Sequence, residues 1–349
     1  MITALPEHEI ILILGDAAYL GWTELSVERG IDSLCGAFSL TLTAREGTGL
    51  PAFPIAAGAP CQVMLNGQPL ITGYVDRRNR RLDKDAIGLT VSGRDKACDL
   101  VDCSAMNSPG SWTGASLETI ARALAAPFGI ELTFASGTGK PLSKFAIQPG
   151  ETAFAAIERL CRYRALIAFS DGNGGVTIGN PDSGKRSGAV VEGDNLLSFE
   201  EENDFSQRFS QYTLKGQASG SDTANGAAVS GLKGEASDPL VTRNRPLLII
   251  GEEQSTAASL TTRAQWEAQT RAARAQRYTA IVPGWQAGGG DIWQPGARAQ
   301  VSVPSHGLAG DLLIERAVLR RSAEDGTTSE LTLVPPEAWA QLAEAEQVL

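Results

Sequence analysis

Apolar and polar residues alternate in short segments over the first hundred residues. These segments are rich in β-branched residues and are separated by Gly, Pro, Asn and Asp; they read EIILILG, TELSVERG, AFSLTLTA, CQVML, PLITGYVDRR and AIGLTVSG. A hydrophobic period of two is typical of a strand with one buried face. The sequence therefore predicts a small β-barrel or sandwich over residues 1–105.

The hydrophobic period becomes that of a helix in residues 106–192. Apolar residues at helical spacing follow Ser116, a plausible N-cap, and precede Gly129, a plausible stop. They are Leu117, Ile120, Ala121 and Leu124. A second apolar helical face follows, formed by Phe154, Ile157, Leu160 and Cys161. The next segment, LIAFSDGNGGVTIG, predicts a hairpin across a Gly-rich turn, so we expect an α/β insert.

The rest of the chain is predicted to return to strands around one long helix. Residues 193–254 contain further strands and a Gly/Ala/Ser-rich stretch, 218–237, without an apolar period, which indicates a mobile loop. Residues 255–277 predict an Arg-rich helix and residues 278–335 a second β unit. The last segment, 336–349, is expected to be a C-terminal helix.

Residues 58–91 and 296–334 are similar to each other. In both, Gly-Ala is followed two residues later by Gln-Val, and an acidic turn precedes the final strand; Arg77-Arg78 aligns with Arg320-Arg321. A chance match between two generic β-meanders is the alternative to a true repeat. The predicted fold class is α+β, mainly β, with two similar barrels separated by the α/β insert and the Arg-rich helix.

Composition narrows the possible functions. The chain has 349 residues and a formal net charge of -10, which disfavours a surface that coats nucleic acid. The N-terminal run HEIILILG is too short to span a membrane and lacks the features of a signal peptide, so we expect synthesis in the cytoplasm and no membrane partner. Five cysteines without a CxxC pair make a disulfide scaffold or a zinc site improbable.

The segment GRDKACDLVDCSA, residues 93–105, is the most chemically suggestive. A short helix would place Asp95, Asp99 and Asp102 along one face, where carboxylates can do acid–base work or hold a metal. The competing interpretation, which we favour, is that acidic residues near a helix start act as caps or dipole partners.

Other candidate chemistry in the sequence is weak. Cys98 or Ser104 would need a base to act as a nucleophile, and nothing ties the two histidines, His8 and His306, to that turn. The GTGK segment lacks the upstream Gly and the following Ser or Thr of a phosphate loop. The acidic run 200–204 could bind a cation but is more typical of a solvated segment. We therefore expect no catalytic residue, no metal and no cofactor.

Several long motifs, in order along nearly the whole chain, resemble the baseplate hub protein of phage Mu-like contractile tails. They are GYVDRRNRR…GLTVSGRDKACDLVDCSA, IQPGETAFAAIERLCRYRALIAFSDGNGGVTI, FSQRFSQYTLKGQ, TRNRPLLII…RAQWEAQTRAARAQR…VPGW and LLIERAVLRR. The residues that match the family as structural motifs are Gly93, Arg94, Asp99, Asp102, Ser104, Arg208, Tyr212, Arg245, Pro246, Trp266 and Trp285. The segment 93–105 resembles the family's hinge into the insert, with Gly93 for a sharp turn and Asp99 or Asp102 as caps.

The resemblance implies a structural protein in the tail baseplate of the virion, assembled in the bacterial host cytoplasm. It implies a homotrimeric ring in which each chain offers two tube-type barrels, between a sixfold tail tube and a threefold spike, with other baseplate proteins nearby. DNA would pass through the channel without specific binding. A cell-wall-degrading enzyme and a receptor-binding adhesin remain alternatives, although the six tryptophans form no cluster in the sequence.

Overall fold

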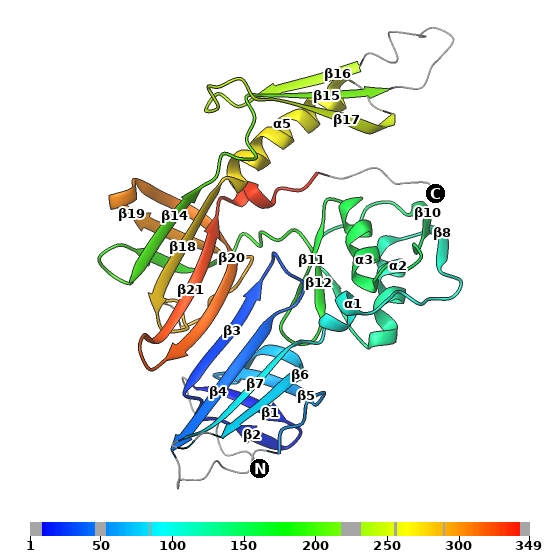
Figure 1. Cartoon of the computed structure of the whole chain (residues 1–349). Coiled ribbons are helices and arrows are strands. Elements are labelled where there is room, and N and C mark those ends of the chain that lie inside the picture. Colours follow the sequence, from blue (N-terminus) through cyan, green and yellow to red (C-terminus); the bar gives the residue numbers. More distant parts are fainter. Residues whose placement is uncertain are drawn as a thin grey trace.

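The computed structural model describes residues 9–45, 54–82, 84, 86–217, 232–254, 257–288 and 290–342. Thirteen of its strands form one continuous sheet, with smaller units beside it (Figure 1). The first half of the sheet has the order β3 (Glu24–Gly30), β4 (Ala37–Arg45), β7 (Ala86–Asp95), β6 (Gln68–Leu82), β5 (Pro60–Leu65), β1 (Ile10–Leu14) and β2 (Ala17–Tyr19). The second half has the order β14 (Ser198–Asn203), β18 (Gln276–Pro283), β21 (Gly326–Val334), β20 (Leu308–Ser322), β19 (Arg298–Val303) and β13 (Arg186–Val191).

The two halves are joined by an antiparallel pairing of β3 with residues 316–321 of β20, which we call the outer part of β20. Val27 of β3 lies opposite Leu319 of β20, and both side chains are buried in the core of the first half. β20 has 15 residues and β19 only 6, so β19 leaves part of the β20 edge to β3. The described strands therefore run from one half into the other as one sheet with no closed barrel among them, and the two expected tube-type barrels are not confirmed.

The internal repeat is visible in the backbone. Gly58 and Gly296 have φ angles of 81° and 80°, a region that glycine adopts without strain. Each donates its amide to the carbonyl of an equivalent residue, Val75 at 2.7 Å and Ile314 at 2.8 Å. The meander β5–β6–β7 thus has the same pairing as β19–β20–β21, which confirms the predicted repeat at the level of strands.

A β-bulge at the same place in β6 and β20 shows which arginines of the two strands are equivalent. The register of β6 shifts between Val75 and Arg77, and that of β20 shifts between Ile314 and Arg316. Arg77 is therefore equivalent to Arg316, and the sequence alignment of Arg77-Arg78 with Arg320-Arg321 is wrong. Both strands are rich in arginine, so residue identity alone selects the wrong pair.

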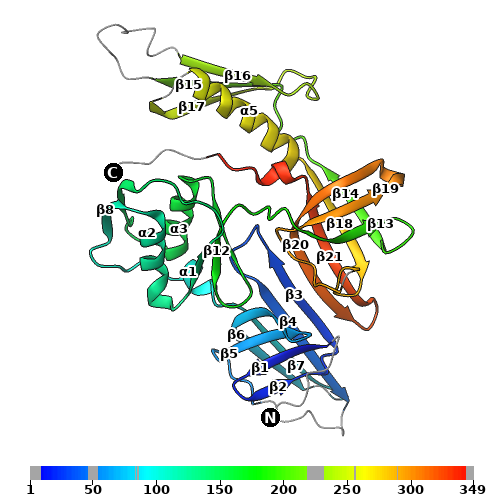
Figure 2. The same cartoon turned by 180° about the vertical axis from the view of Figure 1, so that it is seen from behind.

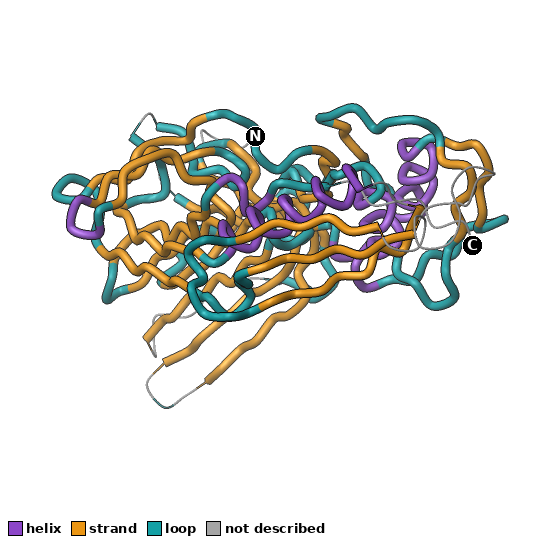
Figure 3. Tube along the Cα trace, turned by 90° about the horizontal axis from the view of Figure 1, so that it is seen from above, coloured by secondary structure: helices purple, strands orange, loops and turns teal. Residues whose placement is uncertain are grey.

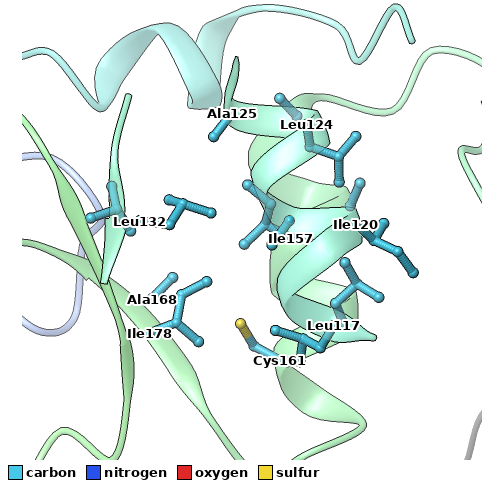
Figure 4. Close-up of a cluster of buried hydrophobic side chains, with 14 of the residues drawn as sticks. Leu117, Ile120, Leu124, Ala125, Leu132, Ile157, Cys161, Ala168 and Ile178 are labelled. Atoms are coloured by element: carbon cyan, nitrogen blue, oxygen red, sulfur yellow. The ribbon is translucent and has the colours of Figure 1, made fainter. Parts of the chain in front are cut away.

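The insert is a compact α/β unit beside the first half. Its elements are α1 (Cys98–Asp102), β8 (Ser111–Ala115), α2 (Leu117–Ala125), η1 (Ala126–Phe128), β9 (Leu132–Phe134), β10 (Leu142–Ala146), α3 (Ala153–Arg162), β11 (Ile167–Ser170) and β12 (Val176–Gly179). Figure 4 shows α2 and α3 facing the strands across Leu124, Ile157 and Ile178. Ser116 caps α2 by accepting from the Thr119 amide, as predicted.

An arm projects from the second half. It consists of the sheet β16 (Leu232–Ser237), β15 (Gln211–Gln217) and β17 (Pro246–Gln254), packed on the long helix α5 (Ala257–Arg274) (Figures 1 and 2). Residues 232–237 form a strand, so the predicted loop 218–237 is wrong there, while 218–231 lie outside the described residues. The predicted return of residues 193–254 to the barrels holds for β14 alone, because β15, β16 and β17 pair only with one another within the described part.

The described end of the chain is extended. Residues 336–349 were expected to form a helix, but the structure has only the 3-10 turn η3 (Pro336–Trp339), and residues 343–349 lie outside the described part. Ala340 follows this turn with φ −58° and ψ 124°, outside the helical region, and its carbonyl accepts a hydrogen bond from the indole of Trp266 at 2.9 Å. Figure 3 shows the insert helices gathered at one end of the molecule. No helix in the described part is long and apolar enough to span a bilayer.

Candidate functional site

The segment between the first half and the insert, residues 93–105, is called the seam here. Asp95, the last residue of β7, is buried, and its carboxylate accepts from the Gly36 amide at 2.6 Å and the Ala97 amide at 3.1 Å. Burial raises the pKa of this carboxyl to about 6. Asp95 thereby fixes the direction in which the chain leaves the sheet and enters α1.

The other two seam carboxylates have different roles from those predicted. Asp102 receives a bidentate hydrogen bond from Arg94, with the shorter contact at 2.8 Å, and Arg94 also donates to Asp76 at 2.8 Å. The Asp99 carboxylate contacts the Cys98 thiol at 3.9 Å. The helix α1 begins without a side-chain cap, so the capping expected of Asp99 or Asp102 is not seen, and it is Asp95 that accepts from the backbone amides of Gly36 and Ala97.

Gly93 lies within β7 and does not make the sharp turn expected of it. Its φ is not positive, and a Cβ there would be 2.0 Å from the Tyr74 carbonyl and 2.8 Å from the Phe38 ring. Glycine is required because a neighbouring strand and a buried ring approach too closely for any side chain. Ser104, at the end of the seam, forms an isolated β-bridge with Thr152, the N-cap of α3.

The contacts of the seam are those of a structural joint. Burial raises the pKa of the Cys98 thiol to about 12, so it is a neutral thiol at pH 7. His306 lies in the second half beside Ser305, whose hydroxyl is 3.0 Å from its Nδ1, while His8 lies outside the described residues. No group of three or more His, Cys, Asp or Glu side chains in the described part could hold a metal ion.

Five of the family-matching residues meet in the arm. Arg208 and Asp238 form a buried bidentate ion pair, with side chains 3% and 5% exposed and contacts of 2.8 and 2.9 Å. Burial acts to raise the pKa of Asp238, but hydrogen bonds from Arg208 and from the Leu240 amide outweigh it and lower that pKa. Tyr212 is fully buried and accepts from the Phe209 amide at 3.0 Å.

The remaining family-matching residues of the arm lie at the start of β17 and on α5. The Arg245 amide donates to Ser210 Oγ at 2.9 Å, and its guanidinium lies over the Phe209 ring. Pro246 begins β17 opposite Gln211. Trp266 lies on α5, 74 residues before the Ala340 carbonyl to which its indole donates. The structure thus places Arg208, Tyr212, Arg245, Pro246 and Trp266 in one unit, where Arg208 and Tyr212 are buried and Pro246 is exposed.

Trp285 lies at a third place, the junction of the two halves. Its indole donates to the Arg320 carbonyl at 2.9 Å, and the Arg321 guanidinium lies 4.8 Å from its ring. Although it follows β18 of the second half, its side chain is buried in the core of the first half. Trp285 therefore locks the two halves together beside the β3–β20 pairing.

Two charged strand edges complete the description. The outer part of β6, beyond its pairing with β5, carries arginines that are all exposed: Arg77, Arg78, Arg80 and Arg81. β14 ends the strand order of the second half and carries Glu200, Glu201 and Glu202, also exposed.

Comparison with known proteins gives the context for this geometry. Residues 9–95 match the N-terminal domain of the Mu phage baseplate assembly protein GpP-like family, 97–180 the second domain of the gp44-like baseplate hub family, and 255–342 the fourth domain of GpP. The chain is 32% identical to the baseplate hub protein gp44 of Escherichia phage Mu, over 94% of this chain and 88% of that protein. The chain belongs to the gp44-like baseplate hub protein family.

Solved structures agree with this membership of the hub family. A 43 kDa tail protein of prophage MuSo2 from Shewanella oneidensis is 31% identical to this hub, with a TM-score of 0.86 over 96% of this chain and 100% of that one. A tail protein from Neisseria meningitidis has the same fold, with a TM-score of 0.81 and 24% identity over 97% of this chain and 100% of that one. The hub is thus a component of a phage tail baseplate, and these relatives are named as tail proteins.

Sequence reasoning missed the residues that join the parts of the hub. Asp95 was considered only as a member of a carboxylate face, and its contact with Gly36, 59 residues away, has no local sequence signal. The acidic run 200–204 was interpreted as solvated. Most of this run lies on β14, a strand at the edge of the sheet. That position follows from the strand order, which the sequence does not show.

Proposed function

We propose that this hub acts as a homotrimeric ring between a sixfold tail tube and a threefold spike. The observation that carries the proposal is the repeat, because each chain contributes two sheet halves in which five strands have equivalent order and pairing register. Three chains then supply six similar units, which suit a sixfold partner on one side and a threefold partner on the other. A ring closes only when every interface is satisfied on both sides.

The second part of the proposal is that the ring encloses a channel for DNA. The net charge of -10 supports a lining that repels phosphates, so that DNA passes without specific binding. The tail tube protein, the spike protein and other baseplate proteins would be its partners, and the host cytoplasm its site of assembly. The names of the relatives, a baseplate hub protein and tail proteins, support this placement.

We also propose that the hub is structural and not an enzyme, and that its family-matching residues act in packing. The buried, neutral Cys98 thiol and the engagement of Asp95 and Asp102 with backbone and arginine support this role. A cell-wall digestion assay with the purified protein should give no activity above a buffer control. Wall degradation by the purified chain would favour the enzyme alternative, and selective binding on a glycan array would favour the adhesin.

Imaging of the assembled tail tip tests the ring directly. Electron cryomicroscopy should show three copies of the chain between the tube and the spike, with the two halves of each chain alternating around the axis. Light scattering of the purified protein gives its mass independently. A sixfold placement, or a single copy in the intact particle, would refute the symmetry-adaptor function.

A further inference from the structure

Because the two halves are repeats, the strand pairing that joins them within one chain predicts a second, equivalent pairing between strands at their other edges. β18 is equivalent to β4, since Tyr278 pairs with Leu333 as Phe38 pairs with Gly93. On the far side of each strand, β14 then occupies the position of β3. The shared bulge makes β20 equivalent to β6. The pairing of β3 with outer β20 therefore has a counterpart, β14 with outer β6.

The counterpart cannot form within one chain. In the strand order, β14 lies at the end of the second half, and β18, β21, β20, β3, β4 and β7 separate it from β6 (Figure 1). In the described part of the chain, neither β14 nor the outer part of β6 pairs with a further strand on its open side. An open edge presents backbone donors and acceptors that another strand can pair with. A second copy of the chain can supply each edge with the strand it lacks.

The charges of the two edges are complementary in this register. In the equivalent pairing, Glu201 takes the place of Val27, and Arg80 takes the place of Leu319. At the neighbouring position, Glu200 would lie opposite Arg81. Further along, Glu202 would lie opposite Asn79 and Asp204 opposite Arg77. Opposite charges directly across an antiparallel pair stabilise it, and like charges destabilise it.

From these observations we propose that copies of the hub join by strand addition, with the acidic β14 of one copy pairing antiparallel with the arginine-rich outer β6 of the next. The inference rests on the proposed ring and specifies the contact that closes it. Within a chain the equivalent pair, Val27 and Leu319, is apolar and buried, so that junction forms as the chain folds. Between copies the pair is ionic, and the run of glutamates prevents β14 from pairing with another β14.

Engineered disulfides test the register. In the full-length hub, Arg80→Cys combined with Glu201→Cys should give disulfide-linked dimers and trimers on a non-reducing gel, because directly opposed Cα atoms lie about 4.5–5.5 Å apart. The matched control, Arg80→Cys with Glu200→Cys, places the thiols on opposite faces and should lose these bands. The same variants are to be oxidised in assembled tails.

Charge reversal tests the attraction. Arg80→Glu or Glu201→Arg alone should weaken self-association by about fivefold per junction, and the double swap should restore it, because each copy offers both edges. Equal cross-linking of the control pair, a double swap no better than the single variants, or cross-links to a different tail protein would overturn the inference. A three-copy ring without the cross-link would leave the proposed function standing and refute only the strand junction. Absence of a three-copy ring would refute the proposed function itself.

Discussion

At the scale of single residues, buried polar side chains fix how the parts of this hub join. Asp95 holds the seam through two backbone amides, and Arg208 and Asp238 hold the arm through a bidentate ion pair. Such groups matter chiefly through what their loss leaves behind, since a buried donor, acceptor or charge without its partner is costly.

Asp95→Asn should change the pH dependence of stability. Because burial raises the pKa of Asp95 from 3.8 to about 6, the folded chain keeps a proton that the unfolded chain releases between those values. This group therefore makes the free energy of unfolding fall as the pH rises from about 4 to about 6, by roughly 3 kcal/mol at about 1.4 kcal/mol per pKa unit. Denaturant titrations should show the substitution costing roughly 3 kcal/mol less at pH 7 than at pH 4.

The matched control for Asp95 is the pair Asp99→Asn and Asp102→Asn. The ion pair of Asp102 with Arg94 is half-exposed, with side chains 50% and 38% exposed, so its loss should cost about 1 kcal/mol or less. If this control lost more unfolding free energy than Asp95→Asn at pH 4, the seam would depend on Asp99 or Asp102 rather than on Asp95.

Arg208→Ala should destabilise the arm by about 3–5 kcal/mol, because it leaves the Asp238 carboxylate buried without its cation. Hydrogen exchange of the β15 and β16 amides measures this locally. Lys233→Ala is the control, since its ion pair with Glu235 is exposed and should contribute less than about 1 kcal/mol. Similar exchange rates in the two variants would contradict the assigned role of the buried pair.

At the scale of elements, close approach of strands decides where side chains are tolerated. Gly93→Ala should destabilise the first half by about 3 kcal/mol or more, because its Cβ would meet the Tyr74 carbonyl at 2.0 Å. Gly88→Ala on the same strand is the control, because the nearest atom, Arg81 Cβ, lies 3.9 Å away. Circular dichroism during thermal unfolding should separate the two variants, and equal midpoints would exclude the steric explanation.

Elements with a strong local signal were predictable from the sequence, and others were not. The helix after Ser116 follows from its cap and its apolar spacing, and both are present in the structure. The strand Leu232–Ser237 reads LKGEAS, in which Leu232, Gly234 and Ala236 alternate with polar residues, but Leu232 is its one large apolar residue, so the strand signal is weak. The strand forms because its backbone pairs with β15. The role of Asp95 in the seam could not be predicted, because Gly36, whose amide donates to it, lies just before β4 and is 59 residues away in the sequence.

At the scale of the whole molecule, the repeat could be recognised in the sequence, but whether each half closes into a barrel could not be predicted from it. Gly58 and Gly296 mark equivalent turns in the sequence and in the backbone. Whether a sheet closes depends on which edge a strand reaches, and β3 reaches β20 of the other half. The sequence carries no local sign of a pairing between residues nearly 300 positions apart.

Salt should separate association of copies from folding of the chain. Screening lengths fall from about 10 Å at 0.1 M salt to about 3 Å at 1 M, so an ionic junction between β14 and β6 weakens while the apolar Val27–Leu319 junction does not. Sedimentation should show the ring dissociating at higher salt with an unchanged circular dichroism spectrum. Association that strengthens with salt would indicate an apolar contact between copies.

The place where the arm joins the hub has a consequence for changes in its length. In the first half, β3 and β4 are linked by the short segment 31–36, whereas in the second half the equivalent strands β14 and β18 are separated by the whole arm. The Asp204 amide donates to the Ala275 carbonyl at 2.8 Å, so the arm leaves and re-enters the sheet at one point. The arm thus occupies the position of the short turn 31–36 of the first half, and because its two ends meet at one point, a change in the length of its strands need not shift the register of any strand in the sheet.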